Sequence, residues 1–439
     1  MTILILLIVV IGLIILATTK YKLHPFLTLL LATIGMGFIV GLDTNTIIKS
    51  LTEGFGKTLS SIGIIIAFGT IIGAYLEKSG GAMVMANSIV KFIGEKRTAL
   101  AINITGFIVS IPVFCDSGFV ILSTLNKALS KKSGISLVVF AVALSAGLYA
   151  THVFVPPTPG PLAAAAILEA NLGLVIILGL VVAIFSSLSG YFWAKYIGKK
   201  IHITPDEISK EEDIEDPKPS AKLSFAPILI PVILIALKSI AEYPTHPFGE
   251  GLLLNIFSFV GNPIVALFVG VFIALNLKKN KNENHFEWMT IGLKEAGIII
   301  LITGAGGAFG NILRTGGIGD VIGSSLSNQH VGILLPFLLA AVLKSAQGSS
   351  TVAIVTTAAI ISPLLEPLGL TSQIGRVLTV LSIGAGSMTV SHLNDSFFWV
   401  VAQFSNMDTS TALKTQTVAT LLQGISGICV ILALSWMFL

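Results

Sequence analysis

The chain has 439 residues, of which 54% are hydrophobic and only 11% are charged. Soluble domains carry roughly a quarter charged residues, so this composition excludes a soluble globular protein. The formal net charge of +4 is modest and indicates no nucleic-acid partner. The two cysteines, Cys115 and Cys429, are far apart and form no metal-type pair.

Apolar segments follow one another along the chain, and several approach the roughly 20 residues that cross a bilayer. We interpret the first as a span, not a cleaved signal peptide, because it leads directly into a second apolar segment. Others are too short to cross alone and form pairs around polar, glycine-rich or proline-rich stretches. We therefore predict an all-α polytopic membrane protein with about 10 crossings and broken transmembrane helices. The segments are 3–18, 24–42, 58–77, 98–113, 119–129, 135–150, 161–170, 172–196, 223–241, 251–277, 291–313, 330–344, 350–365, 374–391, 396–405 and 412–438.

Lysines and arginines predict the orientation, because they are enriched in cytoplasmic connections. They gather at 20–22, 78–97, 127–132 and 195–200. The third cluster follows the second by roughly 30 residues, too few for two crossings at about 1.5 Å per residue. We therefore expect 98–130 to be a re-entrant hairpin open to the cytoplasm and 135–170 to be one broken span.

A polar stretch at 201–222 divides the chain into two transmembrane halves, 1–200 and 223–439. It is rich in Asp and Glu and contains Pro217 and Pro219. These features predict a cytoplasmic linker, and a solvated loop explains them more simply than a regulatory site.

The two halves resemble each other in order and spacing, which indicates an internal repeat with cores at 58–170 and 291–405. The matched stretches are separated by roughly 235–240 residues. They are 64–81 with 298–317, 114–121 with 346–354, and 151–152 with 391–392. The predicted topology gives the cores opposite orientations, so the second hairpin, 330–366, opens to the outside. Inverted repeats with re-entrant hairpins are typical of secondary transporters, whose sites lie near the bilayer midplane.

The two hairpin tips carry candidate site residues. Asp116 is ionisable at membrane depth, which favours a role with a proton or a coupling cation; the alternative is a helix N-cap that faces water. Ser117 and Gly118 leave backbone N–H groups free to bind an anion at a helix start. At the second tip, Lys344 suits a carboxylate substrate, and the alternative is a lysine that snorkels to the outer interface. Gln347, Gly348, Ser349 and Ser350 follow it and offer polar groups.

The two broken spans carry the remaining candidates. The first break contains Pro156, Pro157 and Thr158, and its prolines force an extended chain whose carbonyls can bind substrate or cation. His152 precedes it and either relays protons or is a hydrogen-bonded structural residue. The second break contains His392, Asn394 and Asp395, a cluster too polar for lipid.

Three alternatives to proton-coupled transport remain open at this point. A sodium-coupled carboxylate transporter would use the same segments, and a passive channel would never concentrate its solute. An intramembrane metal-dependent hydrolase would use Asp116, His152, His392 and Asp395, but no H-E-x-x-H spacing supports it.

The sequence has no G-x-x-x-x-G-K-[ST] loop, so ATP does not drive a cycle from within this chain. The glycines at 304–310 are better explained by helix packing than by dinucleotide binding.

At the interrupted segments the sequence resembles the gluconate:proton symporter family, also called the gluconate permease (GntP) family. The resemblance extends over nearly the whole chain. Its most specific parts are FCDSGFV at 114–120, VPPTPGP at 155–161, AQGSSTVA at 346–353 and SHLNDSFFW at 391–399. Cys115 is a small departure, because an aromatic residue is common there in the family.

The resemblance implies a bacterial inner-membrane, proton-coupled importer of gluconate or a related hydroxy or amino acid, such as idonate, D-serine or glycerate. It also implies a homodimer of hairpin-containing inverted repeats, not an enzyme. We expect a small carboxylate and the lipid bilayer as partners, and no metal or cofactor beyond the proton gradient. The expected substrate-binding residues are Ser117, Gly118, Pro156, Pro157, Thr158, Lys344, Gln347, Gly348, Ser349, Ser350 and Asn394. The expected proton-coupling residues are Asp116, His152, His392 and Asp395.

Overall fold

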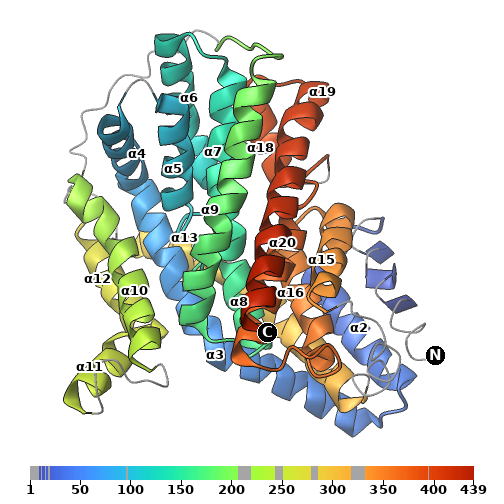
Figure 1. The fold of residues 1–439 in the computed structure, drawn as a ribbon. Coiled ribbons are helices and arrows are strands. Elements are labelled where there is room, and N and C mark those ends of the chain that lie inside the picture. Colours follow the sequence, from blue (N-terminus) through green and yellow to red (C-terminus); the bar gives the residue numbers. More distant parts are fainter. Residues whose placement is uncertain are drawn as a thin grey trace.

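The computed structural model describes residues 9–10, 12–14, 16–17, 20–94, 97–205, 219–242, 251–277, 285–317, 332–393 and 395–439, except for the side chains of residues 62 and 239. Every regular element within these ranges is a helix, which confirms the predicted all-α class (Figure 1). Most of the predicted linker, at 206–218, and residues 330–331 at the start of a predicted hairpin lie outside the described ranges.

The N-terminal half forms a series of helices that range from 9 to 35 residues in length. They are α2 (Pro25–Ile39), α3 (Thr44–Lys78), α4 (Gly81–Ile93), α5 (Thr98–Val109), α6 (Cys115–Ser133), α7 (Leu137–Phe154), α8 (Pro159–Ile167) and α9 (Leu172–Ile197).

The C-terminal half is also built from helices. Its helices are α10 (Ala221–Ala241), α11 (Leu252–Val260), α12 (Pro263–Leu275), α13 (His285–Thr315), α15 (Leu334–Gln347), α16 (Ser350–Ile361), α17 (Gln373–Met388), α18 (Ser396–Phe404), α19 (Thr409–Ala412) and α20 (Val418–Phe438). A 3-10 turn at Ser362–Leu364 follows α16, and a π turn at Leu413–Thr417 joins α19 to α20.

The lengths and composition of these helices fit a multi-pass membrane protein. In the described ranges, five helical stretches are long and apolar enough to cross a membrane, or up to seven if each bent pair is counted as one span. One of the five runs from Leu137 to Ile167 across the α7–α8 break, as expected of a broken span. The remaining apolar helices are too short to cross a bilayer singly and would cross only as pairs joined end to end, so helix length does not give the number of crossings.

Two helices differ from the predicted apolar segments for a physical reason. α3 begins at Thr44, where Asp43 accepts hydrogen bonds from the amides of Asn45 and Thr46, instead of at 58. Its first turns carry Lys49, Glu53 and Lys57 on exposed positions, so a search for apolar runs missed them. α4 was not predicted at all, because it is only 13 residues long and carries polar residues.

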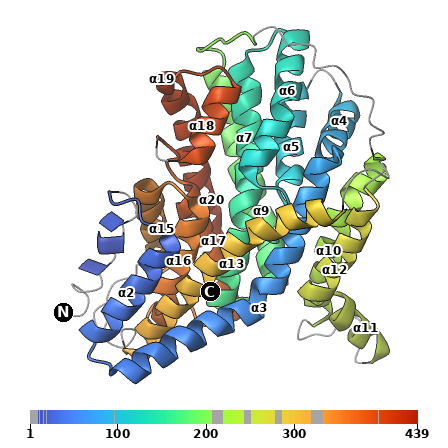
Figure 2. The same ribbon diagram turned by 180° about the vertical axis from the view of Figure 1, so that it is seen from behind.

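The long helices α3 and α13 pack closely against each other and pass diagonally behind the other helices in Figure 1 and in front of them in Figure 2. Glycines allow this approach: a Cβ atom built on Gly54 would lie 2.6 Å from the Gly307 carbonyl oxygen, and one on Gly307 would lie 2.0 Å from Thr58 Oγ1. The interpretation of 304–310 as a packing surface is therefore supported, because small residues bring two helix backbones together.

We expect Gly307→Ala to destabilise the protein by about 1–3 kcal/mol, because the added methyl group overlaps Thr58 and the α3 backbone. Thermal unfolding of the purified protein in detergent measures this as a lower midpoint. Gly297→Ala is the matched control, since a Cβ atom at Gly297 in the same helix meets nothing within 4 Å. Equal midpoints for the two variants would contradict the observed crossing of α3 and α13.

Candidate functional site

The turn between α5 and α6 places a carboxylate in the first turn of a helix. The α5 helix ends at Val109 and α6 begins at Cys115, so Asp116 lies near the exposed amides of the α6 N-terminus. The turn packs tightly against α3, because a Cβ atom at Gly73 would lie 2.6 Å from the Pro112 carbonyl oxygen. This contact fixes the position of the turn, and with it the start of α6.

The turn between α15 and α16 joins a helix end that favours cations to one that favours anions. Gly348 adopts φ +86°, the left-handed conformation that glycine accepts without steric cost. Ser349 then caps α16, its hydroxyl accepting a hydrogen bond from the Val352 amide at 3.3 Å. Lys344 lies in the last turn of α15 and donates to the Gly348 carbonyl oxygen.

The break between α17 and α18 contains a buried carboxylate. Asp395 caps α18, since its Oδ1 accepts a hydrogen bond from the Phe397 amide at 3.1 Å. Its Oδ2 accepts hydrogen bonds from Ser391 Oγ and Lys344 Nζ. Helix α20 holds this break in place, because Thr420 Oγ1 accepts a hydrogen bond from the Ser391 amide at 3.0 Å.

Lys344 and Asp395 therefore form an ion pair, with 2.6 Å between Nζ and Oδ2 and only 1% and 5% of their side chains exposed. Removing a charge from water costs several kcal/mol, and a buried pair is tolerated only when each charge is well satisfied. Here both partners have additional hydrogen bonds. Because a buried ion pair is weak evidence for stability, and ionisable residues at membrane depth mark functional sites, the pair indicates function.

Tyr149 lies at the centre of this region, three residues before His152 on α7. Its ring centroid is 5.7 Å from Lys344 Nζ, 5.2 Å from the Phe397 ring centroid and 6.4 Å from the His152 ring centroid. Its hydroxyl donates to the Ser387 carbonyl oxygen at 3.4 Å. Tyr149 thus connects α7 with α15, α17 and α18.

Three polar side chains near the ion pair have buried atoms that lack a hydrogen-bond partner in the described structure: Asp116 Oδ1, His152 Nδ1, and both Oε1 and Nε2 of Gln347. Asp116 and His152 both interact electrostatically with Lys344 and Asp395. Each unpaired buried polar group costs about 1–3 kcal/mol. Because several such atoms gather beside an ion pair, we interpret this region as a binding site in which a polar ligand supplies the missing hydrogen bonds.

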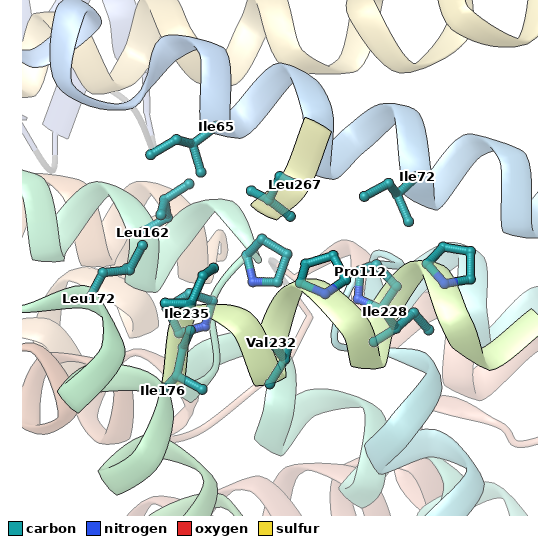
Figure 3. Close-up of a pocket in the computed structure, with 14 residues that line it drawn as sticks. Ile65, Ile72, Pro112, Leu162, Leu172, Ile176, Ile228, Val232, Ile235 and Leu267 are labelled. Carbon is teal, nitrogen blue, oxygen red and sulfur yellow. The ribbon is translucent and has the colours of Figure 1, made fainter. Parts of the chain in front are cut away.

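The proline-rich break faces a different environment. Pro156 and Pro157 line a narrow apolar cavity together with Pro112 and residues of α3 and α10, where Pro112 and Ile228 lie close to each other in Figure 3. The space open to a water-sized molecule is about 10 Å³, too small for a sugar acid. Thr158 Oγ1 donates to the Val155 carbonyl oxygen at 2.5 Å. Substrate contacts from this segment would have to come from its backbone carbonyls.

The structure brings the predicted residues of three interrupted segments together and places the others around them. Ser117 and Gly118 lie in the first turn of α6, and Ser350 is buried at the start of α16. His392 Nε2 lies 3.0 Å from the Ser345 carbonyl oxygen. Asn394 lies outside the described residues.

Three residues that contact the Lys344–Asp395 ion pair or its neighbours were not selected from the sequence, namely Tyr149, Ser391 and Phe397. Tyr149 has a signal that spacing could have revealed, because it lies one helical turn from His152 in an otherwise apolar segment. Ser391 lies four residues before Asp395, in a segment singled out from the sequence for the repeat and the family resemblance but not for a side-chain role. Phe397 carries no signal, because an aromatic residue in an apolar helix is ordinary.

Within the described ranges, no group of three or more His, Cys, Asp or Glu side chains is arranged to hold a metal ion. The interrupted helices, the buried charges and the apolar spans together define a polytopic membrane transport protein.

Comparisons with known proteins identify the family. The model of the GntP family permeases matches residues 1–437, and the chain belongs to this family. A gluconate permease of Pseudomonas aeruginosa is 35% identical over 443 residues, which covers 98% of this chain and 96% of that protein. An uncharacterized permease of Haemophilus influenzae is 36% identical over 437 residues, or 94% of this chain and 88% of that protein. The chain is thus a permease and not an enzyme.

A solved structure supports the fold. The YdaH transporter of Alcanivorax borkumensis aligns with a TM-score of 0.62 over 94% of this chain and 99% of that chain. At 14% sequence identity this likeness concerns the fold alone.

We expect Lys344→Met and Asp395→Asn each to destabilise the protein by about 3–5 kcal/mol, because each leaves one buried charge without its partner. The double variant removes both charges, so its loss of stability should be much smaller than the sum of the losses in the two single variants. Chemical unfolding of the four proteins in detergent measures this coupling.

The exposed ion pair of Lys57 and Glu169 provides the matched control. Its atoms are 2.7 Å apart, but 68% and 48% of the side chains are exposed. The hydrogen bond from Lys57 lowers the pKa of the Glu169 carboxyl, and removal of an exposed pair costs only about 0–1 kcal/mol. Additive losses at Lys344 and Asp395 would contradict the coupling.

Proposed function

We propose that this permease imports gluconate, or a related small hydroxy or amino carboxylate, by proton symport across the bacterial inner membrane. The observation that carries the proposal is the buried Lys344–Asp395 ion pair beside the unpartnered polar atoms of Asp116, His152 and Gln347. The gluconate permease among its relatives supports the substrate class.

In this proposal the two halves are inverted repeats, with α5–α6 and α15–α16 as re-entrant hairpins. Both helices of the first pair occupy the upper part of the two views, and both helices of the second pair occupy the lower part (Figures 1 and 2). The C-terminal ends of α6 and α9 lie at the upper side in Figure 1, and their last turns carry Lys131, Lys132 and Lys195. By the positive-inside rule this side would be cytoplasmic. The two turns then meet near the midplane from opposite sides.

The substrate carboxylate would bind between these two turns. The N-termini of α6 and α16 present the backbone amides of Ser117 and Ser350, which favour an anion. The Gly118 amide, expected from the sequence to be free, instead donates to the Phe114 carbonyl oxygen at 2.8 Å. Lys344 is bound to Asp395 in this structure, so it becomes available to the carboxylate when Asp395 is protonated or moves. Gln347 has an unpaired donor and an unpaired acceptor, which suit the hydroxyl groups of a sugar acid.

In this proposal, proton coupling depends on the charges of Asp116, Asp395 and Lys344. Protonation of Asp116 or Asp395 removes a negative charge, which lowers the cost of bringing a carboxylate beside Lys344. His152 and His392 are further candidates to transfer the proton. A singly charged anion moved with one proton carries no net charge, so a pH gradient drives accumulation by about tenfold per pH unit.

We expect purified protein in liposomes to accumulate radiolabelled gluconate against its concentration gradient when the outside is made acidic. Unlabelled idonate, D-serine, glycerate and dicarboxylates, added in turn, rank the competing substrates. Uptake that depends on Na⁺ and ignores the pH gradient would exclude the proton assignment, and flux that never exceeds equilibrium would indicate a channel.

We expect Asp116→Asn to reduce uptake driven by the pH gradient at least tenfold, because the amide cannot carry the proton. The matched control is Asp43→Asn at the exposed N-cap of α3, since asparagine caps a helix equally well. Unchanged pH-driven uptake in Asp116→Asn, with the protein folded, would show that Asp116 is not part of the coupling.

A further inference from the structure

A polar cavity lies away from the ion pair, between the first turn of α5, the α6–α7 connection and the end of α9. Its volume is about 690 Å³, within the range of small-molecule sites. These helix ends lie at the upper side of the molecule in Figure 1. From Val139, which lines the cavity, to His152 the α7 helix rises about 20 Å, so this cavity is separate from the proposed substrate site.

The charged side chains that line the cavity, Arg97, Lys195 and Lys199, are cationic, and the imidazole of His202 lies among the lining residues. No carboxylate is among its described lining residues, and no ion pair joins Arg97, Lys195 or Lys199 to an acidic side chain within the described ranges. Lys195 Nζ instead lies 5.7 Å from the centroid of the Tyr191 ring, a cation–π contact. The cavity therefore favours an anion.

The N-terminus of α5 also faces this cavity, through Thr98, Ala99 and Leu100. This 12-residue helix has no side-chain cap, because Arg97 at the N-cap position makes no such hydrogen bond. The first backbone amides of a helix have no partners inside it, and the helix dipole adds positive potential at this end. Both features are those of a phosphate-binding helix start.

The Thr98 hydroxyl is an independent sign of a missing ligand. The side chain is 96% buried, at 4% exposure, and its Oγ1 has no hydrogen-bond partner in the described structure. A buried hydroxyl without a partner is unfavourable. A phosphate oxygen in the cavity would accept its hydrogen bond.

The cavity is preformed by contacts between its walls. Ser136 Oγ donates to the Ile201 carbonyl oxygen at 3.1 Å and accepts from the Ile203 amide at 3.1 Å. Gly198 lies so close to α7 that a Cβ atom there would meet Val139 Cγ2 at 2.1 Å. These contacts fix the segment after α9 against the start of α7, so the basic residues at 195–202 keep their positions around the cavity.

The remaining lining is apolar and includes Leu100, Ile135 and Val139. The orientation given under the proposed function, on which this inference rests, places the cavity at the cytoplasmic ends of transmembrane helices. A cavity there that is cationic in one part and apolar in another suits a phospholipid better than a free ion, since basic pockets of this kind bind anionic head groups. We propose that this cavity binds the phosphate group of an anionic phospholipid from the cytoplasmic leaflet.

The test compares phosphatidylglycerol with phosphatidylcholine of the same acyl chains, added to the full-length protein in detergent. We expect phosphatidylglycerol to bind more tightly, measured by native mass spectrometry and by the shift in thermal unfolding. Lys195→Gln combined with Lys199→Gln should weaken its binding by about 30-fold, roughly fivefold for each lysine. Thr98→Val, which changes no charge, should weaken it by a smaller factor.

The control removes two lysines of the same face outside the cavity, Lys91→Gln with Lys131→Gln, and should leave phosphatidylglycerol binding unchanged. An equal loss of phosphatidylglycerol binding in the control variant, or no preference for phosphatidylglycerol over phosphatidylcholine, would overturn the proposal. Either result would show that the lipid is attracted to the basic surface in general and not to this cavity. Inorganic phosphate is added alone as a further arm. A stabilisation by millimolar phosphate equal to that by phosphatidylglycerol would overturn the lipid assignment.

Discussion

The buried ion pair between Lys344 and Asp395 is the constraint on which the rest of the structure depends. It joins the turn between α15 and α16 to the break between α17 and α18, two segments that could not lie in lipid. Because both charges are removed from water, each requires the other and additional hydrogen bonds. The Gly348 carbonyl, the Ser391 hydroxyl and the Phe397 amide supply them. In the proposed mechanism a substrate carboxylate near Lys344 competes with Asp395, and this competition would couple a proton to an anion.

The surrounding helices hold this pair at the meeting point of the interrupted segments. Phe397 packs against both Phe119 of α6 and Tyr149 of α7, so the carboxylate of the second half lies beside the helices that carry Asp116 and His152. The glycine contacts between α3 and α13, and between Gly73 and Pro112, fix the frame around them. The site is thus built from polar ends of short helices inside a rigid apolar surround, which matches the general design of secondary transporters.

Much of this organisation was predictable from the sequence because membranes impose strong constraints. The helical class follows from apolar segments that must satisfy their own backbone hydrogen bonds, and the interrupted segments follow from prolines, glycines and polar residues inside them. The partner of Lys344 was not predictable, because 51 residues separate it from Asp395 and only the fold brings them together. The first part of α3 and all of α4 were missed because their polar residues hide a helix from any search for apolar runs. Thr98 and Lys195 gave no sign of a shared cavity, since nothing in their spacing relates α5 to α9.

We propose that substrate and proton move together, and their movement can be measured in one experiment. Liposomes that contain the purified protein and a trapped pH-sensitive dye receive external gluconate with no imposed pH gradient. The account predicts that the interior acidifies as gluconate enters, with a constant number of protons for each molecule at every gluconate concentration. Gluconate influx with no change in internal pH would contradict it.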